Sequence, residues 1–230
     1  MKKLILSGLT LLAFTGVAGA DIRITEVMSS SGTGGTNDWF EVRNFSNSAV
    51  SLAGWRMDDN SFNVANSVEL FGVSSIAAGE SIVFIENTGD GATTVDSFKT
   101  FWFGATAPSG FQVGFYNGSG AGVSFGSGSG GDGVALFDGP GGAERFRVTF
   151  GAATTGRSFD NHLGNSGLIS TVSTVGVNGA FLSSNGLGNI GSPSAVPEPA
   201  SMLLLGMAGI GGLAFRRLRR KTNKSETSAS

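Results

Sequence analysis

Alternation of apolar and polar residues predicts β-strands along the first ninety residues of the chain. Phe40 and Val42 alternate with Glu41 and Arg43, which is the period of a strand with one face in a core and one face in water. Turn-forming Gly, Asn, Asp and Ser residues separate this run from similar ones. The segments predicted as strands are 22–28, 39–45, 50–57, 68–71 and 81–86, the last of them central.

The segment between positions 87 and 131 departs from this spacing. The runs 98–103 and 111–116 carry aromatic residues at alternating positions, which predicts an extra hairpin or an extended sheet edge. The Gly-rich run 118–133 predicts a flexible connection. If they are exposed, three aromatic residues of this insertion form a candidate ligand platform: Trp102, Phe111 and Tyr116.

The first twenty residues have the three parts of a secretory signal peptide. Lys2 and Lys3 form a basic start, residues 4–17 form an apolar run, and Ala18 and Ala20 occupy an A-x-A cleavage site. We therefore predict a signal peptide over 1–20 and a mature protein that begins near position 21.

The C-terminal end combines a rigid Pro-Glu-Pro, an apolar run and a basic cluster. As a helix, residues 200–215 would span roughly 24 Å, a little less than a hydrocarbon core of about 30 Å. A basic cluster after such a run is typical of the cytoplasmic end of a membrane segment. We predict a short transmembrane helix at 200–215 and a polar tail over 222–230. The basic stop at 216–221 contains Arg216, Arg217, Arg219, Arg220 and Lys221.

Charge and composition narrow the class of protein. The formal net charge is −2, but residues 21–199 hold sixteen acidic and seven basic side chains, a net charge of about −9. Nucleic-acid affinity depends mostly on neutralising phosphates, so nucleic acid is not expected as a partner. The chain has no cysteine, which excludes disulfides and thiolate sites. Its 38 Gly residues, with abundant Ser, Thr, Val and Phe, predict an extracellular all-β protein.

The tail resembles the PEP-CTERM sorting signal, the tag of exosortase substrates in Gram-negative bacteria that produce exopolysaccharide. The resemblance covers 196–221 and includes all three parts in order. It implies transient insertion into the inner membrane, processing by an exosortase at Pro197, Glu198 and Pro199, and release or transfer to the cell surface.

The strand motifs resemble those of the lamin tail domain, an immunoglobulin-like β-sandwich. The matching motifs are 24–27 (ITEV), 39–44 (WFEVRN), 51–55 (SLAGW) and 76–83 (IAAGESIV). Segments 132–138 and 145–150 resemble the last two strands of that domain. The resemblance implies an all-β sandwich over 21–162 with an aromatic and Gly-rich insertion, and it places Trp39 and Trp55 in the core. A Ser/Gly/Asn-rich edge and spacer over 163–195 would lead to the sorting signal at 196–221.

Candidate catalytic residues are few. His162 is the only histidine, and a Ser-His-Asp triad would need it with Asp160 and either Ser158 or Ser166. The sequence has no nucleophile elbow, so we interpret 160–162 as an exposed turn. We expect no enzymatic activity, and a secreted hydrolase is the weakest alternative.

Carboxylate side chains give two further candidate sites, a catalytic pair and a Ca²⁺ site. Glu26 and Glu41 could approach each other across neighbouring strands, as a glycosidase pair does, but the resemblance gives them a structural role. Ca²⁺ is the one cofactor with candidate ligands, at 58–60 and at Asp132 and Asp138, although neither follows the EF-hand pattern. We expect solvated turn residues and no cofactor.

These features predict an exported, non-enzymatic protein of the cell surface or extracellular matrix, associated with biofilm or exopolysaccharide. The alternative is a carbohydrate- or Ca²⁺-dependent binding module that reaches the surface by the same route.

Overall fold

The computed structural model describes residues 21–118 and 123–194, so the predictions for 1–20 and 195–230 lie outside the described residues. The described chain forms one helix and fourteen strands. The helix is α1 (Gly91–Phe103), and the strands are β1 (Ile22–Met28), β2 (Trp39–Asn44), β3 (Val50–Ser51), β4 (Arg56–Asp58), β5 (Val68–Phe71), β6 (Ser75–Ile76), β7 (Ser81–Asn87), β8 (Val113–Asn117), β9 (Asp132–Phe137), β10 (Glu144–Phe150), β11 (Phe159–Asp160), β12 (Gly167–Ile169), β13 (Phe181–Leu182) and β14 (Ile190–Gly191). In this part of the chain no helix combines the length and apolar character needed to cross a membrane.

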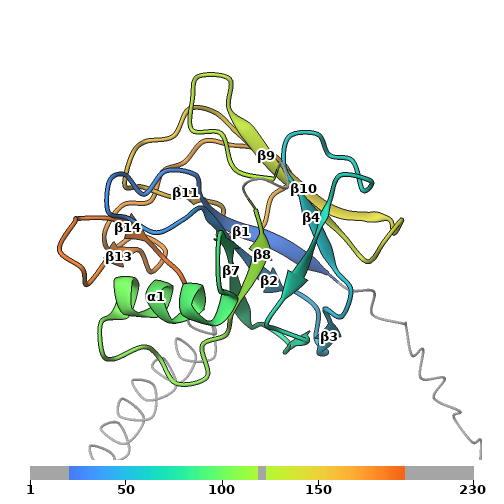
Figure 1. The fold of residues 1–230 in the computed structure, drawn as a ribbon, viewed down its shortest axis with the longest axis horizontal. Helices are drawn as coiled ribbons and strands as arrows, with labels where there is room; N and C mark the ends of the chain where they lie inside the picture. Colours follow the sequence, from blue (N-terminus) through green and yellow to red (C-terminus); the bar gives the residue numbers. More distant parts are fainter. Residues whose placement is uncertain (1–20, 119–122, 195–230) are drawn as a thin grey trace, which may run out of the picture.

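Ten strands form one continuous order that folds into two layers (Figure 1). The order is β11-β1-β2-β7-β8-β5-β4-β9-β10-β12. β5 pairs with β8 on one side and with β4 on the other, so it connects the layers. β1 then packs against β10 across the core. Two short pairs, β3–β6 and β13–β14, complete the sheets of the described chain. The predicted all-β sandwich is confirmed, with one helix added.

Alternating side chains fill the core between the layers. Phe40 of β2 lies in the same buried cluster as Leu136 of β9, from the opposite layer. The register between β1 and β2 shifts between Ile24 and Glu26, which is a β-bulge. Because of this bulge, Ile24 and Val27 both reach the core although they are three positions apart.

The first aromatic run of the insertion is helical, so the predicted extra hairpin is wrong. β7 and β8 pair in parallel, and parallel neighbours need a crossover connection, which α1 provides. The Asp90 side chain accepts a hydrogen bond from the N–H of Thr93 at 2.9 Å and caps the helix. Phe98 and Trp102 lie one turn apart and pack edge-on against Trp39 of β2. Four aromatics within six residues fit a helical period as well as a strand period, which explains the error.

The Gly-rich run also packs on the sandwich where it is described. Val123 and Phe125 are buried in the core, and the Phe125 ring lies 6.3 Å from Phe40 and 6.1 Å from Tyr116. The predicted flexible connection is therefore wrong for residues 123–125, which pack on the core, and for 132–133, which begin β9. Residues 119–122 lie outside the described chain.

Residues 163–194 belong to the folded body, where β12 lies at the edge of the sheet, as the predicted edge requires, but 189–194 do not form the predicted spacer. β12 pairs in parallel with β10, and β13 pairs with β14 beside α1 (Figure 1). We call residues 189–194 the C-terminal strap. Asn189 donates a hydrogen bond to the backbone oxygen of Ser31 at 2.9 Å, and the N–H of Ile190 donates to the oxygen of Gly156 at 2.8 Å.

β2 is buried on both faces, although its alternation predicts one wet face. α1 covers Trp39, and the C-terminal strap covers Glu41, which is only 3% exposed. The pattern gave the correct core face, but the covering segments come from distant parts of the chain.

Replacement of Trp102 tests the packing of α1. The ring is fully buried, so Trp102→Ala should lower the free energy of unfolding by about 3–5 kcal/mol in a denaturant titration. Lys99→Ala, on the same helix and only partly buried, should change it by less than about 0.5 kcal/mol. Equal effects of the two changes would contradict this packing.

Candidate functional site

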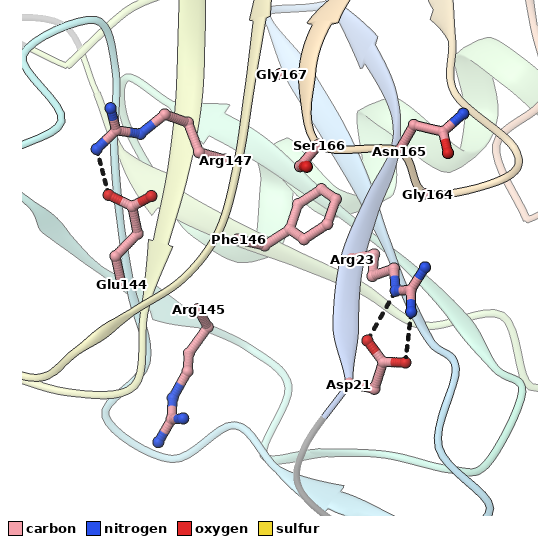
Figure 2. Close-up of a pocket in the computed structure, with 10 residues that line it drawn as sticks. All are labelled: Asp21, Arg23, Glu144, Arg145, Phe146, Arg147, Gly164, Asn165, Ser166 and Gly167. Carbon is pink, nitrogen blue, oxygen red and sulfur yellow. Dashed lines mark hydrogen bonds and ion pairs between the residues drawn. The ribbon is translucent and has the colours of Figure 1, made fainter.

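An open groove lies between the start of β1, the strand β10 and the loop 164–167 (Figure 2). Its volume is about 820 Å³, which is within the range of ligand pockets. Charged side chains and one aromatic ring line it together with the loop: Asp21, Arg23, Glu144, Arg145, Phe146 and Arg147. Three of the seven basic residues of segment 21–199 therefore line one groove.

Each arginine of the groove is held by an acid. Arg23 forms two hydrogen bonds to Asp21, from Nε at 2.7 Å and from Nη2 at 2.8 Å (Figure 2). The hydrogen bond to Asp21 raises the pKa of Arg23. Glu144 pairs with Arg147 of the same strand, on the side of the groove away from Arg23 (Figure 2). The third pair, Arg145 with Asp138, joins β10 to the end of β9.

Aromatic rings orient two of these guanidinium groups. The guanidinium carbon of Arg23 lies 4.8 Å from the centroid of the Phe45 ring, and that of Arg147 lies 4.1 Å from Phe62. Stacking on a ring and ion pairing both favour one orientation of the planar guanidinium. The groove lining thus combines guanidinium donors with carboxylate acceptors and is suited to a hydroxylated or acidic ligand.

The sequence interpretation missed this groove. Arg145 and Arg147 are two positions apart in a predicted strand, so the period of a strand already places them on one face. Their place in one groove with Arg23 depends on the packing of β1 against β10, which no local pattern contains.

Two buried glutamates form a second cluster, on the outer face of the first layer. Glu26 of β1 and Glu41 of β2 are paired in register, and they are 0% and 3% exposed. Their predicted approach across neighbouring strands is confirmed. Because solvent does not reach them, they do not form the open carboxylate pair that a glycosidase needs.

The C-terminal strap supplies hydrogen-bond donors to both carboxylates. Glu26 accepts the N–H of Ser192 at 2.7 Å and its hydroxyl at 3.0 Å. Glu41 accepts the N–H of Ser194 at 2.8 Å and the hydroxyl of Thr25 at 2.6 Å. The strap therefore closes over the pair.

The strap also approaches the pair closely at Gly191. A Cβ atom at this position would lie 2.9 Å from the Trp102 ring and 3.0 Å from Glu26 Oε1. Only glycine fits here without movement of its neighbours.

Burial disfavours charge on this pair. Loss of hydration raises the pKa of Glu26 and of Glu41 above the usual value of 4.5, and the neighbouring Glu26 raises that of Glu41 further. The hydroxyl of Ser158 donates to Glu26 and opposes the rise in its pKa. The pair therefore retains protons at a pH at which exposed carboxyl groups are ionised.

Asp160 and His162 of the candidate catalytic triad are in contact, but in the described chain neither candidate serine is bonded to His162. His162 Nδ1 lies 3.3 Å from Asp160 Oδ1 and 2.8 Å from Asn178 Nδ2, at the surface. Ser158 is fully buried and directs its hydroxyl to Glu26, whereas Ser166 lines the arginine groove.

The predicted aromatic ligand platform is wrong. Trp102 and Tyr116 are fully buried, the former between α1 and the first layer and the latter in the core between the layers. Phe111 is partly buried and packs on Phe103 with ring centroids 5.3 Å apart. The framework residues Trp39 and Trp55 are buried, as expected.

The acidic turns use their carboxylates within the fold. Asp58 Oδ2 accepts the Ser61 hydroxyl at 2.6 Å and the N–H of Asn63 at 2.8 Å, and Asp132 Oδ1 accepts the N–H of Gly133 at 2.7 Å. Over residues 21–118 and 123–194, no group of three or more His, Asp or Glu side chains is placed to hold a metal ion.

The predicted targeting residues lie outside the described chain. They are the signal cleavage residues Ala18 and Ala20, the processing residues Pro197, Glu198 and Pro199, and the basic stop Arg216, Arg217, Arg219, Arg220 and Lys221.

Comparison with known families gives two matches. The model of the Lamin Tail Domain matches residues 16–152, which is more than half of the chain, and the model of the PEP-CTERM protein-sorting motif matches residues 195–220. No curated protein and no solved structure matches the chain. Both resemblances drawn from the sequence are confirmed, and β11 to β14 lie between the two matched regions.

The buried pair gives the stability of the domain a pH dependence. Since the folded state holds protons that the unfolded state releases near pH 4.5, the contribution of the pair to the free energy of unfolding should be greatest below pH 4.5 and should be lost as the pH rises through the raised pKa values of the pair. A carboxyl group whose pKa is one pH unit higher in the folded than in the unfolded state contributes about 1.4 kcal/mol to this fall. Denaturant titrations at pH 5 and pH 8 should show a smaller fall for Glu41→Gln than for the wild type. A matched change at the partly exposed Glu69 of β5 should leave the fall unaltered, and equal falls in all three proteins would contradict the assignment.

Proposed function

The chain belongs to the lamin tail domain family and carries a PEP-CTERM sorting motif, and we propose that it is a non-enzymatic protein of the cell surface or extracellular matrix of a Gram-negative bacterium. We propose further that this protein binds exopolysaccharide through the arginine groove. The sorting motif itself implies an exported precursor that is anchored in the membrane and processed by an exosortase. Cleavage near Pro197 and transfer to the biofilm matrix are the further steps of the proposal.

The groove is the observation that supports a saccharide ligand. A sugar presents hydroxyl groups that both donate and accept, and the paired arginines and acids of the groove offer both roles. Ion pairs this exposed contribute only about 0–1 kcal/mol to the free energy of unfolding. An arginine of the groove can therefore replace its bond to the acid by a bond to a ligand at little cost. Phe146 adds a half-buried apolar surface for the face of a sugar ring.

The other candidate functions have less support. The Ca²⁺-dependent binding module lacks a described cluster of ligands, and its aromatic platform is buried. A secreted hydrolase would need Ser158 or Ser166 beside His162, but Ser158 is bonded to Glu26. A carboxylate hydrolase would need Glu26 and Glu41 to meet solvent and substrate, and both are buried. A role in ligand binding at the cell surface therefore fits the geometry better than catalysis.

Processing can be tested in the producing bacterium. Deletion of Pro197-Glu198-Pro199 should leave the protein at its unprocessed mass in the membrane fraction, as should loss of the exosortase in the wild-type background. Immunoblots of membrane, surface and medium fractions measure both effects. Identical mass and location with and without the exosortase would refute the sorting step.

Binding can be tested with groove variants of the processed protein. Arg23→Ala with Arg147→Ala should weaken binding to exopolysaccharide purified from the producing strain by about tenfold or more, since two oriented donors are lost. Calorimetry with this polymer, a polyuronate and a neutral glucan shows whether acidic groups are required. Lys99→Ala, on α1, is the matched control and should bind normally. Unchanged binding by the double variant would remove the groove from the proposal.

A further inference from the structure

Charged residues are absent from the last part of the described chain. Between positions 21 and 160 there are fifteen acidic and seven basic side chains, whereas positions 163–194 contain no Asp, Glu, Lys or Arg. One long surface segment is thus neutral on a domain that is otherwise strongly acidic.

Most of the exposed large hydrophobic side chains of the described residues belong to this neutral segment. They are Leu163, Leu168, Val175, Val177, Leu182 and Leu187, which are between 49% and 73% exposed. Four of them fall within 175–187, which comprises a turn, strand β13 and the loop from β13 towards β14. The turn is closed by the hydrogen bond from the N–H of Gly176 to the oxygen of Ala180, at 2.8 Å, and leads directly into β13. We call residues 174–188 the neutral tip.

The C-terminal strap limits how the anchored precursor can lie on the membrane. The strap is bonded to the buried glutamates as far as Ser194, and the sorting motif begins at position 195. Only residues 195–199 separate Ser194 from the apolar run that starts at Ala200, a reach of at most about 20 Å. A domain of this length has a radius of gyration of about 16 Å, hence a diameter of about 40 Å, so the tether is too short to let every face reach the bilayer.

We propose that the neutral tip is the face with which the anchored precursor rests on the lipid bilayer. Through β14 the tip continues into the strap, so it lies on the tethered side of the domain. Anionic headgroups repel the acidic remainder, whereas the tip carries no charge and offers Val and Leu side chains to the interface. Figure 1 shows β13 and β14 on the opposite side of the domain from β10, which bears the arginine groove, so that docking leaves the groove accessible. The proposal rests on membrane anchoring by the sorting motif and is independent of saccharide binding.

The absence of cysteine allows single-site labelling of the full chain. Leu182→Cys and Leu187→Cys, each labelled with an environment-sensitive fluorophore, are reconstituted as full-length precursor in phosphatidylethanolamine and phosphatidylglycerol vesicles without exosortase. Both sites are more than half exposed, so the substitutions do not disturb the core. Ser51→Cys, exposed on β3, is the control. We expect blue-shifted emission and loss of most of the fluorescence with brominated lipids at 182 and 187, and neither effect at 51.

Three results would overturn the proposal, and they are distinguishable. If the precursor does not float with the vesicles, anchoring itself fails, and the docking with it. If it floats but the labels at 182 and 187 are quenched no more than the label at 51, the docking alone is refuted. If lipid does not quench them but energy transfer occurs between differently labelled copies, the neutral tip binds a second copy of the chain instead.

Discussion

Two carboxyl groups on the outer face of the first layer impose a constraint on the rest of the fold. A glutamate removed from water is costly unless it is neutralised or given hydrogen-bond donors, and Glu26 and Glu41 are buried side by side. Their donors come from Thr25 nearby and from Ser158, Ser192 and Ser194 far along the chain. The last strands and the strap are therefore part of the folding unit, although the family match ends at position 152.

Local sequence patterns predicted the features that depend on neighbouring residues, namely the core face of a strand and the position of its ends. Phe40 and Val42 were assigned to the core because alternation alone fixes the face of a strand, and turn residues fixed most strand ends. The same pattern could not show that Glu41 would be covered, since its cover is a strap about 150 positions later. Helix α1 was missed because its aromatics satisfy two periods, and the parallel pairing of β7 with β8 decides between them.

The candidate site was less predictable than the fold. The arginine groove needs β1, β10 and the loop 164–167 together, and only the spacing of Arg145 and Arg147 is visible in the sequence. The sequence favoured aromatic residues as ligand contacts instead. These rings belong to two buried hydrophobic clusters, one between the two layers and one between α1 and the first layer. Sequence patterns were most informative at the C-terminal end of the chain, where the sorting motif is recognised by its composition and order rather than by contacts.

The closure of the strap over Glu26 also has a consequence for timing. The partners of this contact, Glu26 and Ser192, are separated by 166 positions, so the contact cannot form before the end of the domain is present. β1 is thus completed by the segment that directly precedes the sorting motif at position 195. A precursor sorted by this motif has its full set of native contacts only once the whole chain up to the motif is available for folding.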